Sequence, residues 1–493
     1  MGEEQGWLLG ASFNRSIKVR EADPRLSDNG GVLLVREADH QLGLTAGLAE
    51  QLHDDRDLRY ARYSQLELLR QHIYSLAMGY VHQDDHDALA HDAAMRMAVW
   101  DRSGQEVIDQ RLASQPSTWR LIEQLGGKAN REHLREGLAW WLGHHQRASG
   151  GGRKVQHGTI DMDPFPVEVH GRQPGAAYHG HYKQSMYYPM AASFSAEGDY
   201  NSPRLGDGFV HAMLRAGNCG GASGAVRFAR EAIRKCRPLA CGLDVRIDAG
   251  LVEGKVLDAI DDEGVRFLGR IRGNARLDEL ARPYLKRPPG RPTSEGDELA
   301  VELGAYQAAS WTRPYRLVLV VVDLPDAKTG LRRLFPHHFF LITNWPAKRR
   351  EAWELVEHYR QRGTFEDRLS ELNACVHGGL SQDSFVANET SLLLKMLAFN
   401  LASMLRGEME AASGNGWDLK RLQQTVLKAG LRVTRHGRRL IAHVTRAAGV
   451  LWHRLLERVR RWWHDPTWRT APPGARPWKP PPSHAHRTLV LRE

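Results

Sequence analysis

Cysteine is scarce in this chain, whose 493 residues include only Cys219, Cys236, Cys241 and Cys375. No two of them stand at the Cys-x-x-Cys spacing that is typical of a structural zinc site. So few cysteines in so long a chain exclude the disulfide-stabilised scaffold of a small secreted protein. We therefore expect reduced thiols and a cytoplasmic protein.

Long apolar runs are missing as well. The chain contains no stretch of about 18 apolar residues, which is the length that a membrane-spanning helix needs. The first residues include Glu3 and Glu4 and lack the basic-then-apolar layout of a secretory signal. The sequence therefore predicts no membrane partner and no export.

Acidic residues are outnumbered by basic ones, 58 against 68, which gives a formal net charge of +10. This balance favours a polyanionic partner, with nucleic acid first and a membrane surface second, over surface basicity alone. From Arg432 to Arg461 nine arginines face one acidic residue, Glu457. Two interpretations stay open for this stretch, a solvated basic helix and a contact surface for the DNA backbone, and the local charge favours the second.

The hydrophobic period changes along the chain. Apolar residues recur at helical spacing up to a Gly-rich linker at Ala148–Arg153, and beyond it they alternate as in strands. We predict an α/β protein with five successive regions: a mostly helical N-terminal region, 1–150; a first α/β part, 151–271; a β-rich insertion, 272–346; a second part with a long helix, 347–410; and a basic helical region with a Pro-rich tail, 411–493.

Three aspartates stand at the ends of predicted strands. Asp161 and Asp163 share one face of an alternating segment, in which Pro164 limits further sheet pairing. Asp248 closes the alternating strand Leu243–Asp248. Ligand sites of open α/β sheets gather at the carboxyl ends of strands, so these acids are candidate site residues.

One helix, predicted from Lys348 to Val376, carries further candidate site residues. Tyr359, Arg362 and Glu366 stand at i, i+3 and i+7 and therefore share one helical face. A carboxylate one turn from an arginine and two turns from a tyrosine suits the handling of phosphate and metal. Carboxylates are the ligands that Mg²⁺ prefers, and two such ions can promote phosphodiester chemistry.

These residues resemble the DDE-type transposases of bacterial insertion sequences. Tyr359, Arg362 and Glu366 match the Tyr-x2-Arg-x3-Glu-x6-Lys signature of one group, and Arg246-Ile247-Asp248-Ala249-Gly250 matches the phrase around the family's second aspartate. Asp161-Met162-Asp163 is similar to the phrase around the first. Further similar phrases spread the resemblance over most of residues 12–440, including Gly30-Gly31-Val32, Leu112-Ala113-Ser114-Gln115-Pro116 and Thr343-Asn344.

The resemblance implies a fold and a reaction. The fold is a ribonuclease H-like catalytic core with a β-rich insertion, preceded by a helical region that binds DNA. Family members bind the terminal inverted repeats of their element, cut its ends with Mg²⁺ and join them to target DNA in a cut-and-paste reaction, some through a hairpin intermediate. A homodimer that pairs two DNA ends, and a place with the bacterial nucleoid, are implied as well.

The same resemblance assigns residues. Asp163, Asp248 and Glu366 are the expected catalytic residues and ligands of two Mg²⁺ ions, for which Mn²⁺ can substitute; Asp161 is the alternative first acid. Tyr359 and Arg362 are expected to hold a DNA phosphate, an interaction for which a guanidinium and a phenol are suited.

Two positions depart from the family pattern. Asn373 stands where the signature has lysine, so a hydrogen-bond donor toward the DNA phosphate is kept but its charge is lost. Pro164 replaces a small hydroxyl residue. These departures leave open a catalytically impaired DNA-binding relic as an alternative to an active transposase. A hydrolytic nuclease on the same fold is a further alternative.

Overall fold

The computed structural model describes residues 7–10, 18–20, 25–102, 104–150, 153–197, 206–287, 297–325, 329–330 and 334–462. The predicted Pro-rich tail at Pro466–Pro482 lies outside these residues. Among the described helices none has the length and apolar character to cross a membrane.

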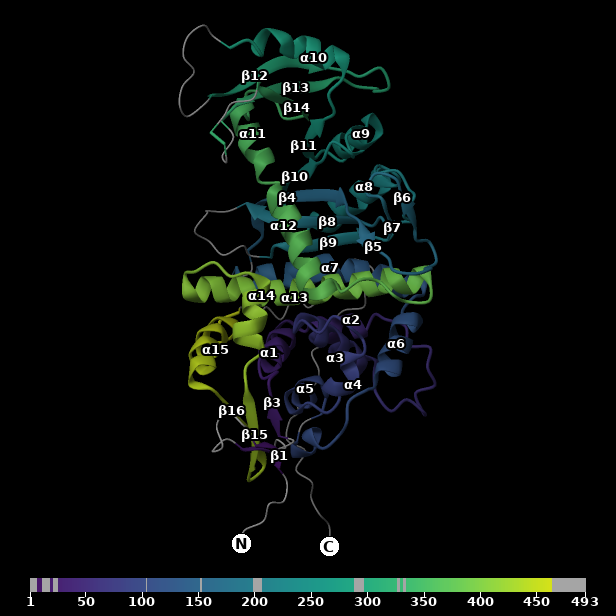
Figure 1. Cartoon of the computed structure of the whole chain (residues 1–493), viewed down its shortest axis with the longest axis vertical. Helices are drawn as coiled ribbons and strands as arrows, with labels where there is room; N and C mark the ends of the chain where they lie inside the picture. The colour runs from purple at the N-terminus through teal and green to yellow at the C-terminus, as the bar shows by residue number, and fades with distance from the viewer. Residues whose placement is uncertain are drawn as a thin grey trace.

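An eight-stranded mixed sheet organises the upper half of the molecule (Figure 1), in the order β12-β13-β14-β11-β10-β4-β8-β9. The strands β4, β10 and β11 are parallel, and the outer ones are antiparallel. Their bounds are β4 Val155–Pro164, β8 Met190–Glu197, β9 Gly208–Met213, β10 Ala240–Ile247, β11 Arg266–Ile271, β12 Asp297–Tyr306, β13 Tyr315–Asp323 and β14 His337–Thr343.

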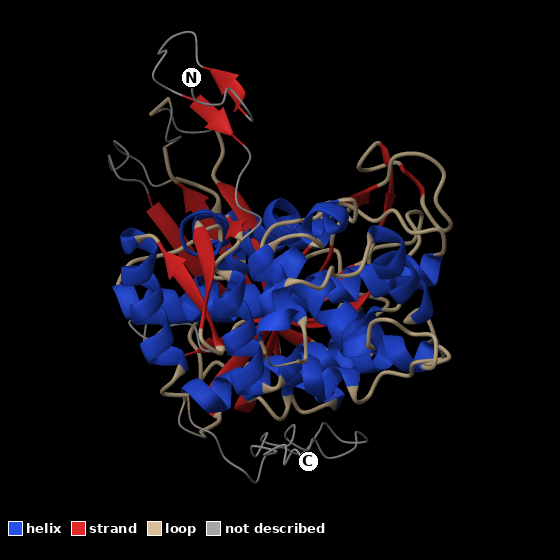
Figure 2. Ribbon diagram, turned by 90° about the horizontal axis from the view of Figure 1, so that it is seen from below, coloured by secondary structure: helices blue, strands red, loops and turns tan. Residues whose placement is uncertain are grey.

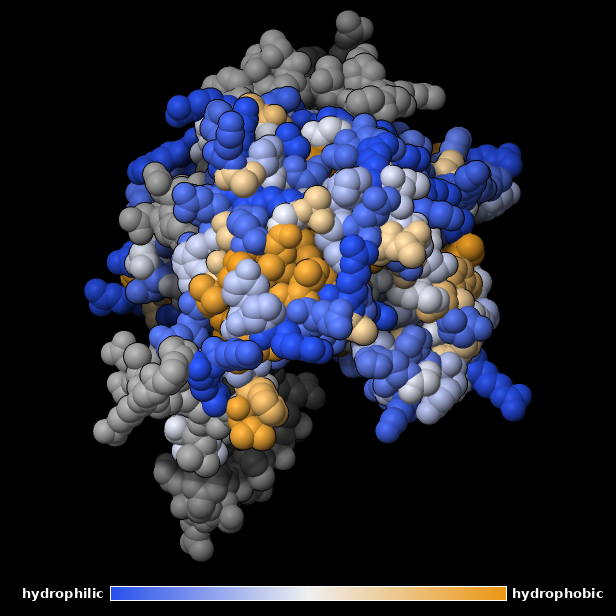
Figure 3. Space-filling model, turned by 90° about the horizontal axis from the view of Figure 1, so that it is seen from above, coloured by the Kyte–Doolittle hydropathy of each residue, from blue (hydrophilic) through white to orange (hydrophobic). Residues whose placement is uncertain are grey.

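The segment 272–346 is rich in strands, as its sequence predicts. Its strands β12 to β14 extend the central sheet, because β14 pairs antiparallel with β11. Seen from that end of the molecule, an apolar area is ringed by hydrophilic side chains (Figure 3). Exposed apolar residues of the elements at this end include Leu280 and Leu299.

The alternation of β4 and β10 sorts apolar from charged side chains. Ile160 and Ile247 belong to the large hydrophobic core, whereas Asp161 and Arg246, which are register partners, point to the opposite face. The strand β4 ends at Pro164, because proline has no N–H to continue the ladder.

Helices cover both faces of the sheet (Figure 1). On one side lie α8 (Ala225–Cys236) and α9 (Gly254–Asp262), and on the other α11 (Ala352–Arg360) and α12 (Gly363–Leu372). A smaller core joins Leu355 and Val356 of α11 to Leu268, Val318, Val320 and Leu341 of the sheet. The side chain of Phe365 from α12 packs edge-on against Phe209 of β9.

The predicted single helix Lys348–Val376 is wrong in its continuity. Its first helical residue is Ala352, after a capping box between Glu351 and Glu354, and the helix is interrupted between Arg360 and Gly363. There the hydrogen bonds tighten to i→i+3, as from the Phe365 amide to the Arg362 carbonyl. A glycine at 363 weakens helix propensity at this point, and a π-helical turn, Asn373–His377, follows α12.

The lower half is mostly helical, as seen from below (Figure 2). The 29-residue helix α13 (Phe385–Ser413) crosses the molecule between the sheet and this half, and it contacts β9, α7, α3 and α15. The helices before the sheet are α1 Val32–Leu42, α2 Leu44–Ala49, α3 Gln65–Ala77, α4 Asp85–Leu89, α5 Ala93–Val99, η1 Gln105–Ile108, α6 Gln115–Gln124 and α7 Lys128–Ser149.

The basic C-terminal stretch differs from its prediction as a helical region. It starts with a hairpin, β15 (Leu431–His436) and β16 (Arg439–Val444), and only then forms α15 (Arg446–Val459). β-Branched residues such as Val433 and Thr434, followed by Gly437 at a positive φ of 58°, favour the hairpin. The remaining elements are β1 Trp7–Gly10, β2 Lys18–Arg20, β3 Leu26–Ser27, β5 Val167–Glu168, β6 Ala177–His179, β7 Gln184–Tyr187, α10 Ala275–Ala281, η2 Arg282–Tyr284, α14 Leu419–Leu422 and η4 Gln423–Leu427.

Candidate functional site

Three acids meet where the central parallel strands end. Asp163 is the penultimate residue of β4, Asp248 directly follows β10, and Glu366 lies in the first turn of α12. Because β4 and β10 are parallel neighbours with Met162 opposite Ile247, the next residue of each strand ends at the same edge. The negative charges of Asp248 and Glu366 both act on the Asp163 carboxylate.

Arg362 joins two of these acids. It lies in the interruption between α11 and α12, and its guanidinium donates one hydrogen bond to Asp163 Oδ2 and another, of 2.8 Å, to Glu366 Oε1. Its side chain is buried, whereas that of Glu366 is 66% exposed. The guanidinium therefore holds together an acid of the sheet and an acid of the helix.

Burial raises the pKa of Asp163 to about 7. The neighbouring Arg362 lowers this pKa, while the carboxylates of Asp248 and Glu366 raise it further. Burial alone would lower the pKa of Arg362, but Asp163 and the other negative groups outweigh that effect and raise it. The site thus brings three acids together at one guanidinium, and carboxylate oxygens are the ligands that a hard cation prefers.

The three acids fit a hard divalent cation in their chemistry, because they supply only carboxylate oxygens. Arg362 already occupies two of them. It donates to one oxygen of each, Oδ2 of Asp163 and Oε1 of Glu366, so the second oxygen of each carboxylate could bind a cation while the guanidinium stays in place.

Asp161, the alternative first acid, has a different position. It is fully buried, and Arg246 donates to both of its oxygens, with Nε–Oδ1 and Nη2–Oδ2 distances of 2.8 and 2.7 Å. Arg246 also donates to the His358 carbonyl at 2.7 Å, so the pair ties two strands to α11. Both Asp161 oxygens are engaged, which favours Asp163 as the acid that is available to a ligand.

The two other predicted phosphate-binding residues differ in their relation to the acids. Tyr359 is half-buried on α11; burial raises its pKa to about 12, and Arg362 and Asp248 are among the charges that act on it. Asn373 is exposed at the start of the π-helical turn, and no contact of the described residues joins it to the three acids.

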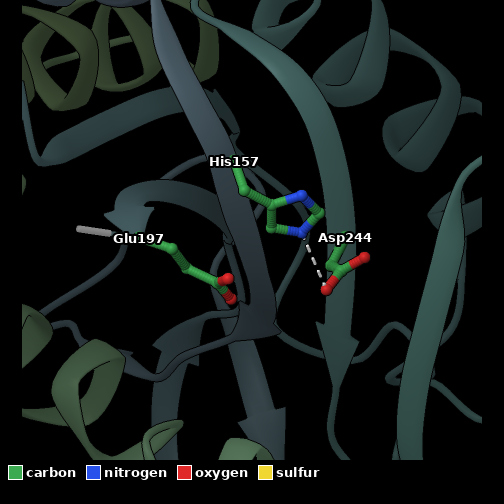
Figure 4. A group of neighbouring side chains, drawn as sticks. All are labelled: His157, Glu197 and Asp244. Carbon is green, nitrogen blue, oxygen red and sulfur yellow. Dashed lines mark ion pairs between the residues drawn. The ribbon is translucent and has the colours of Figure 1, made fainter. Parts of the chain in front are cut away.

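A second cluster of polar residues was not predicted from the sequence. His157 of β4, Glu197 of β8 and Asp244 of β10 each offer one atom that could bind a metal, and these atoms all lie within 4.8 Å of one another (Figure 4). The alternation that places Asp244, Arg246 and Asp248 on one face was visible in the sequence. The pairing of His157 with Glu197 depends on strand register, and the sequence did not reveal that register.

Known proteins offer two points of comparison. The family described as "Transposase DDE domain group 1" matches residues 9–462. Among solved structures, a cryo-EM structure of the piggyBac transposase synaptic complex with hairpin DNA is similar over 88% of this chain and 82% of that chain, with a TM-score of 0.39 and 12% identity. That likeness is too weak to support an argument about this chain. No curated protein matches it.

Proposed function

Since the chain belongs to the family of DDE transposases, which are metal-dependent DNA-transposing enzymes, we propose that it is the cut-and-paste transposase of an insertion sequence. It binds the terminal inverted repeats of the element, cleaves its ends and joins them to target DNA. The observation that supports this proposal is the meeting of Asp163, Asp248 and Glu366 around Arg362.

The proposed chemistry divides between metal and protein. Bound Mg²⁺ ions would activate the attacking oxygen and neutralise charge at phosphorus. Asp163, Asp248 and Glu366 supply the oxygen ligands. Water attacks the phosphorus, the bond to the 3′ oxygen breaks, and a 3′ hydroxyl and a 5′ phosphate result. In the joining step that 3′ hydroxyl gives up its proton and attacks a target phosphodiester, whose own 3′ oxygen leaves and takes up a proton.

Arg362 has two partners in this proposal. In the free protein it neutralises Asp163 and Glu366. If cations were bound by those carboxylates, the guanidinium could turn to the DNA phosphate, which it would bind through two parallel N–H groups. Tyr359 and Asn373 add hydrogen bonds to the DNA backbone.

Further parts of the proposal concern assembly. We assign a ribonuclease H-like core to the central strands and DNA binding to the helical region 1–150. Two copies of the chain pair the two DNA ends, in the bacterial nucleoid. The decisive experiment is an end-cleavage assay with DNA from either side of the gene, with and without Mg²⁺. Cleavage without strand joining would favour the nuclease alternative, and binding without cleavage the DNA-binding relic.

The dependence on Mg²⁺ should change with pH. With a pKa of about 7, Asp163 is mostly protonated at about pH 6, so Mg²⁺ competes with a proton there. The Mg²⁺ concentration for half-maximal cleavage should be roughly tenfold higher at about pH 6 than at about pH 8.

The raised pKa of Asp163 also means that the folded, metal-free chain binds more protons than the unfolded chain between the two pKa values, 3.8 and about 7. Its stability should therefore fall as pH rises through this window.

Asp163→Asn is the matched control for the stability measurement, which does not depend on cleavage. It removes the titrating group, so the part of the stability change that comes from this acid should vanish. An unchanged slope of unfolding free energy against pH in this variant would contradict the assignment of the titration to Asp163.

The basic C-terminal surface should set part of the salt dependence of DNA binding. Arg438 and Arg439 near the hairpin turn, and Arg460 and Arg461 after α15, are exposed. Replacing all four by glutamine should flatten the plot of log affinity against log salt by up to about 3.6, because each phosphate contact contributes roughly 0.9.

The chain offers a control with the same change of charge. Four arginines in and after α8 are exposed and paired with acids: Arg227, Arg230, Arg234 and Arg237. Their replacement should leave the salt slope close to that of the unaltered protein. Equal slopes for both quadruple variants would mean that the C-terminal arginines are only solvated.

A further inference from the structure

A polar cluster lies in the sheet, away from the three acids that the proposed function uses. His157 stands near the start of β4, opposite Glu197 on β8, while Asp244 comes from β10 on the other side. Their facing atoms are within 4.8 Å of one another (Figure 4). Three neighbouring strands therefore bring one imidazole and two carboxylates to a single point.

Asp244 is a buried carboxylate that has ion-pair neighbours but no hydrogen bond. It is only 1% exposed, and neither of its oxygens accepts a hydrogen bond from the described residues. His157 Nε2 lies 3.0 Å from Asp244 Oδ2, but the contact lacks the geometry of a hydrogen bond and Nε2 also remains without one. Leaving such a group unsatisfied is costly, so the site calls for a further charged partner.

His358 of α11 lies next to the cluster and contacts two of its members. Its Nδ1 lies 3.5 Å from Glu197 Oε1 and its Nε2 lies 3.5 Å from Asp244 Oδ2, where Nε2 makes no hydrogen bond. Burial, together with Arg246 and Arg350, lowers the pKa of His358 to about 2. Both ring nitrogens of His358 therefore face carboxylates of the cluster, and its Nε2 is free of a hydrogen bond.

Two other polar groups face this point. The Arg350 guanidinium lies 3.6 Å from Glu197 and 3.8 Å from Asp244; its side chain is 20% exposed and stacks over Trp345. Thr159 donates its hydroxyl to Glu197 Oε1 at 3.0 Å. Arg350 offsets the negative charge of Glu197 and Asp244, but no hydrogen bond to either acid is observed. Because its side chain is partly exposed, it can move toward solvent when a cation binds.

We propose that His157, Glu197 and Asp244, with His358 as the fourth ligand, form a binding site for a borderline divalent metal ion of the Zn²⁺ type. Two imidazoles and two carboxylates suit Zn²⁺, whereas Mg²⁺ prefers oxygen alone. The ion would fasten α11 to three strands of the sheet. Because Tyr359 is the next residue after His358, this site would also fix the helix from which Tyr359 projects.

The test uses the full chain with the other acids neutralised, Asp163→Asn, Asp248→Asn and Glu366→Gln. The metal-stripped protein is titrated with Zn²⁺ against a competing chelator. One Zn²⁺ should bind tightly and raise Tm. Adding either Asp244→Asn or His157→Gln should weaken binding by roughly 100-fold or more, since loss of a mere partner of a ligand already costs about 10–100-fold.

His453→Gln on α15 is the matched control, because His453 forms an exposed pair with Glu457 at 3.3 Å. Zn²⁺ affinity should not change in that variant. X-ray absorption of the bound ion should show nitrogen and oxygen neighbours and no sulfur. Absence of tight binding, a sulfur neighbour, or equal affinity in the folded Asp244→Asn and His157→Gln variants would overturn the proposal. None of these outcomes bears on the transposase chemistry, since the three acids are already replaced.

Discussion

Replacement of any one of Asp163, Asp248 and Glu366 by alanine should reduce Mg²⁺-dependent end cleavage by about 10³-fold or more. Each residue is expected to hold a cation whose stabilisation of the transition state is worth several kcal/mol, and each 1.36 kcal/mol is a factor of ten. The measurement is single-turnover cleavage of DNA from the element's end. DNA binding, followed in parallel, should remain measurable because the residues act on the cut phosphate.

Asp163 requires a closer comparison, because its neighbour Asp161 is the alternative first acid. Asp163→Asn keeps the shape and should still lose cleavage, while the fold is retained. If Asp163→Ala cuts normally and a folded Asp161 variant does not, the first acid is Asp161. Full activity in all three alanine variants would rule out the proposed mechanism.

Asp161→Ala should instead destabilise the protein by about 3–5 kcal/mol. Removing one partner of a buried pair leaves the other charge uncompensated, and here Arg246, at 2% exposure, would keep only the His358 carbonyl at a normal hydrogen-bond distance. The measurement is urea unfolding of the metal-free chain, with cleavage assayed at a temperature where the variant is folded.

A double replacement separates the pair from its surroundings. Asp161→Leu together with Arg246→Met exchanges two charges for apolar groups of similar size, and such exchanges are often neutral. The double variant should therefore be more stable than Asp161→Ala alone. A loss below about 1 kcal/mol in Asp161→Ala would show that the buried pair contributes little to folding.

Much of the sheet was predictable from alternation. The predicted strand Leu243–Asp248 overlaps the second part of β10, Ala240–Ile247, because its apolar and charged residues alternate. Within the predicted helix Lys348–Val376, the apolar residues Phe365, Leu372 and Val376 stand at helical spacing and are buried. Strand and helix periods depend on local sequence, which is why they could be read.

Long-range geometry was not predictable in the same way. The hydrogen bond from Arg362 to Asp163 joins residues that are 199 positions apart, and no helical period reports such a contact. The pairing of Leu431 and Arg432 with Ser27 and Leu26 likewise joins the hairpin to the other end of the chain. The placement of three acids at one point was inferred from family motifs, and their metal-binding role remains a prediction.

The long helix α13 has a consequence for how the protein can be divided. One part of its surface packs against β9 and another against α3 and α7, and nearly all its residues from Ala387 to Leu405 are buried. A fragment that ends before Phe385 would lack α13, which covers part of the sheet. A fragment that begins at Phe385 would expose the apolar side chains of α13 to water. The sheet and the helices below it therefore form one folding unit. We expect insertions and fusions to be tolerated at its outer loops, and exchange of one half for that of another protein not to be tolerated.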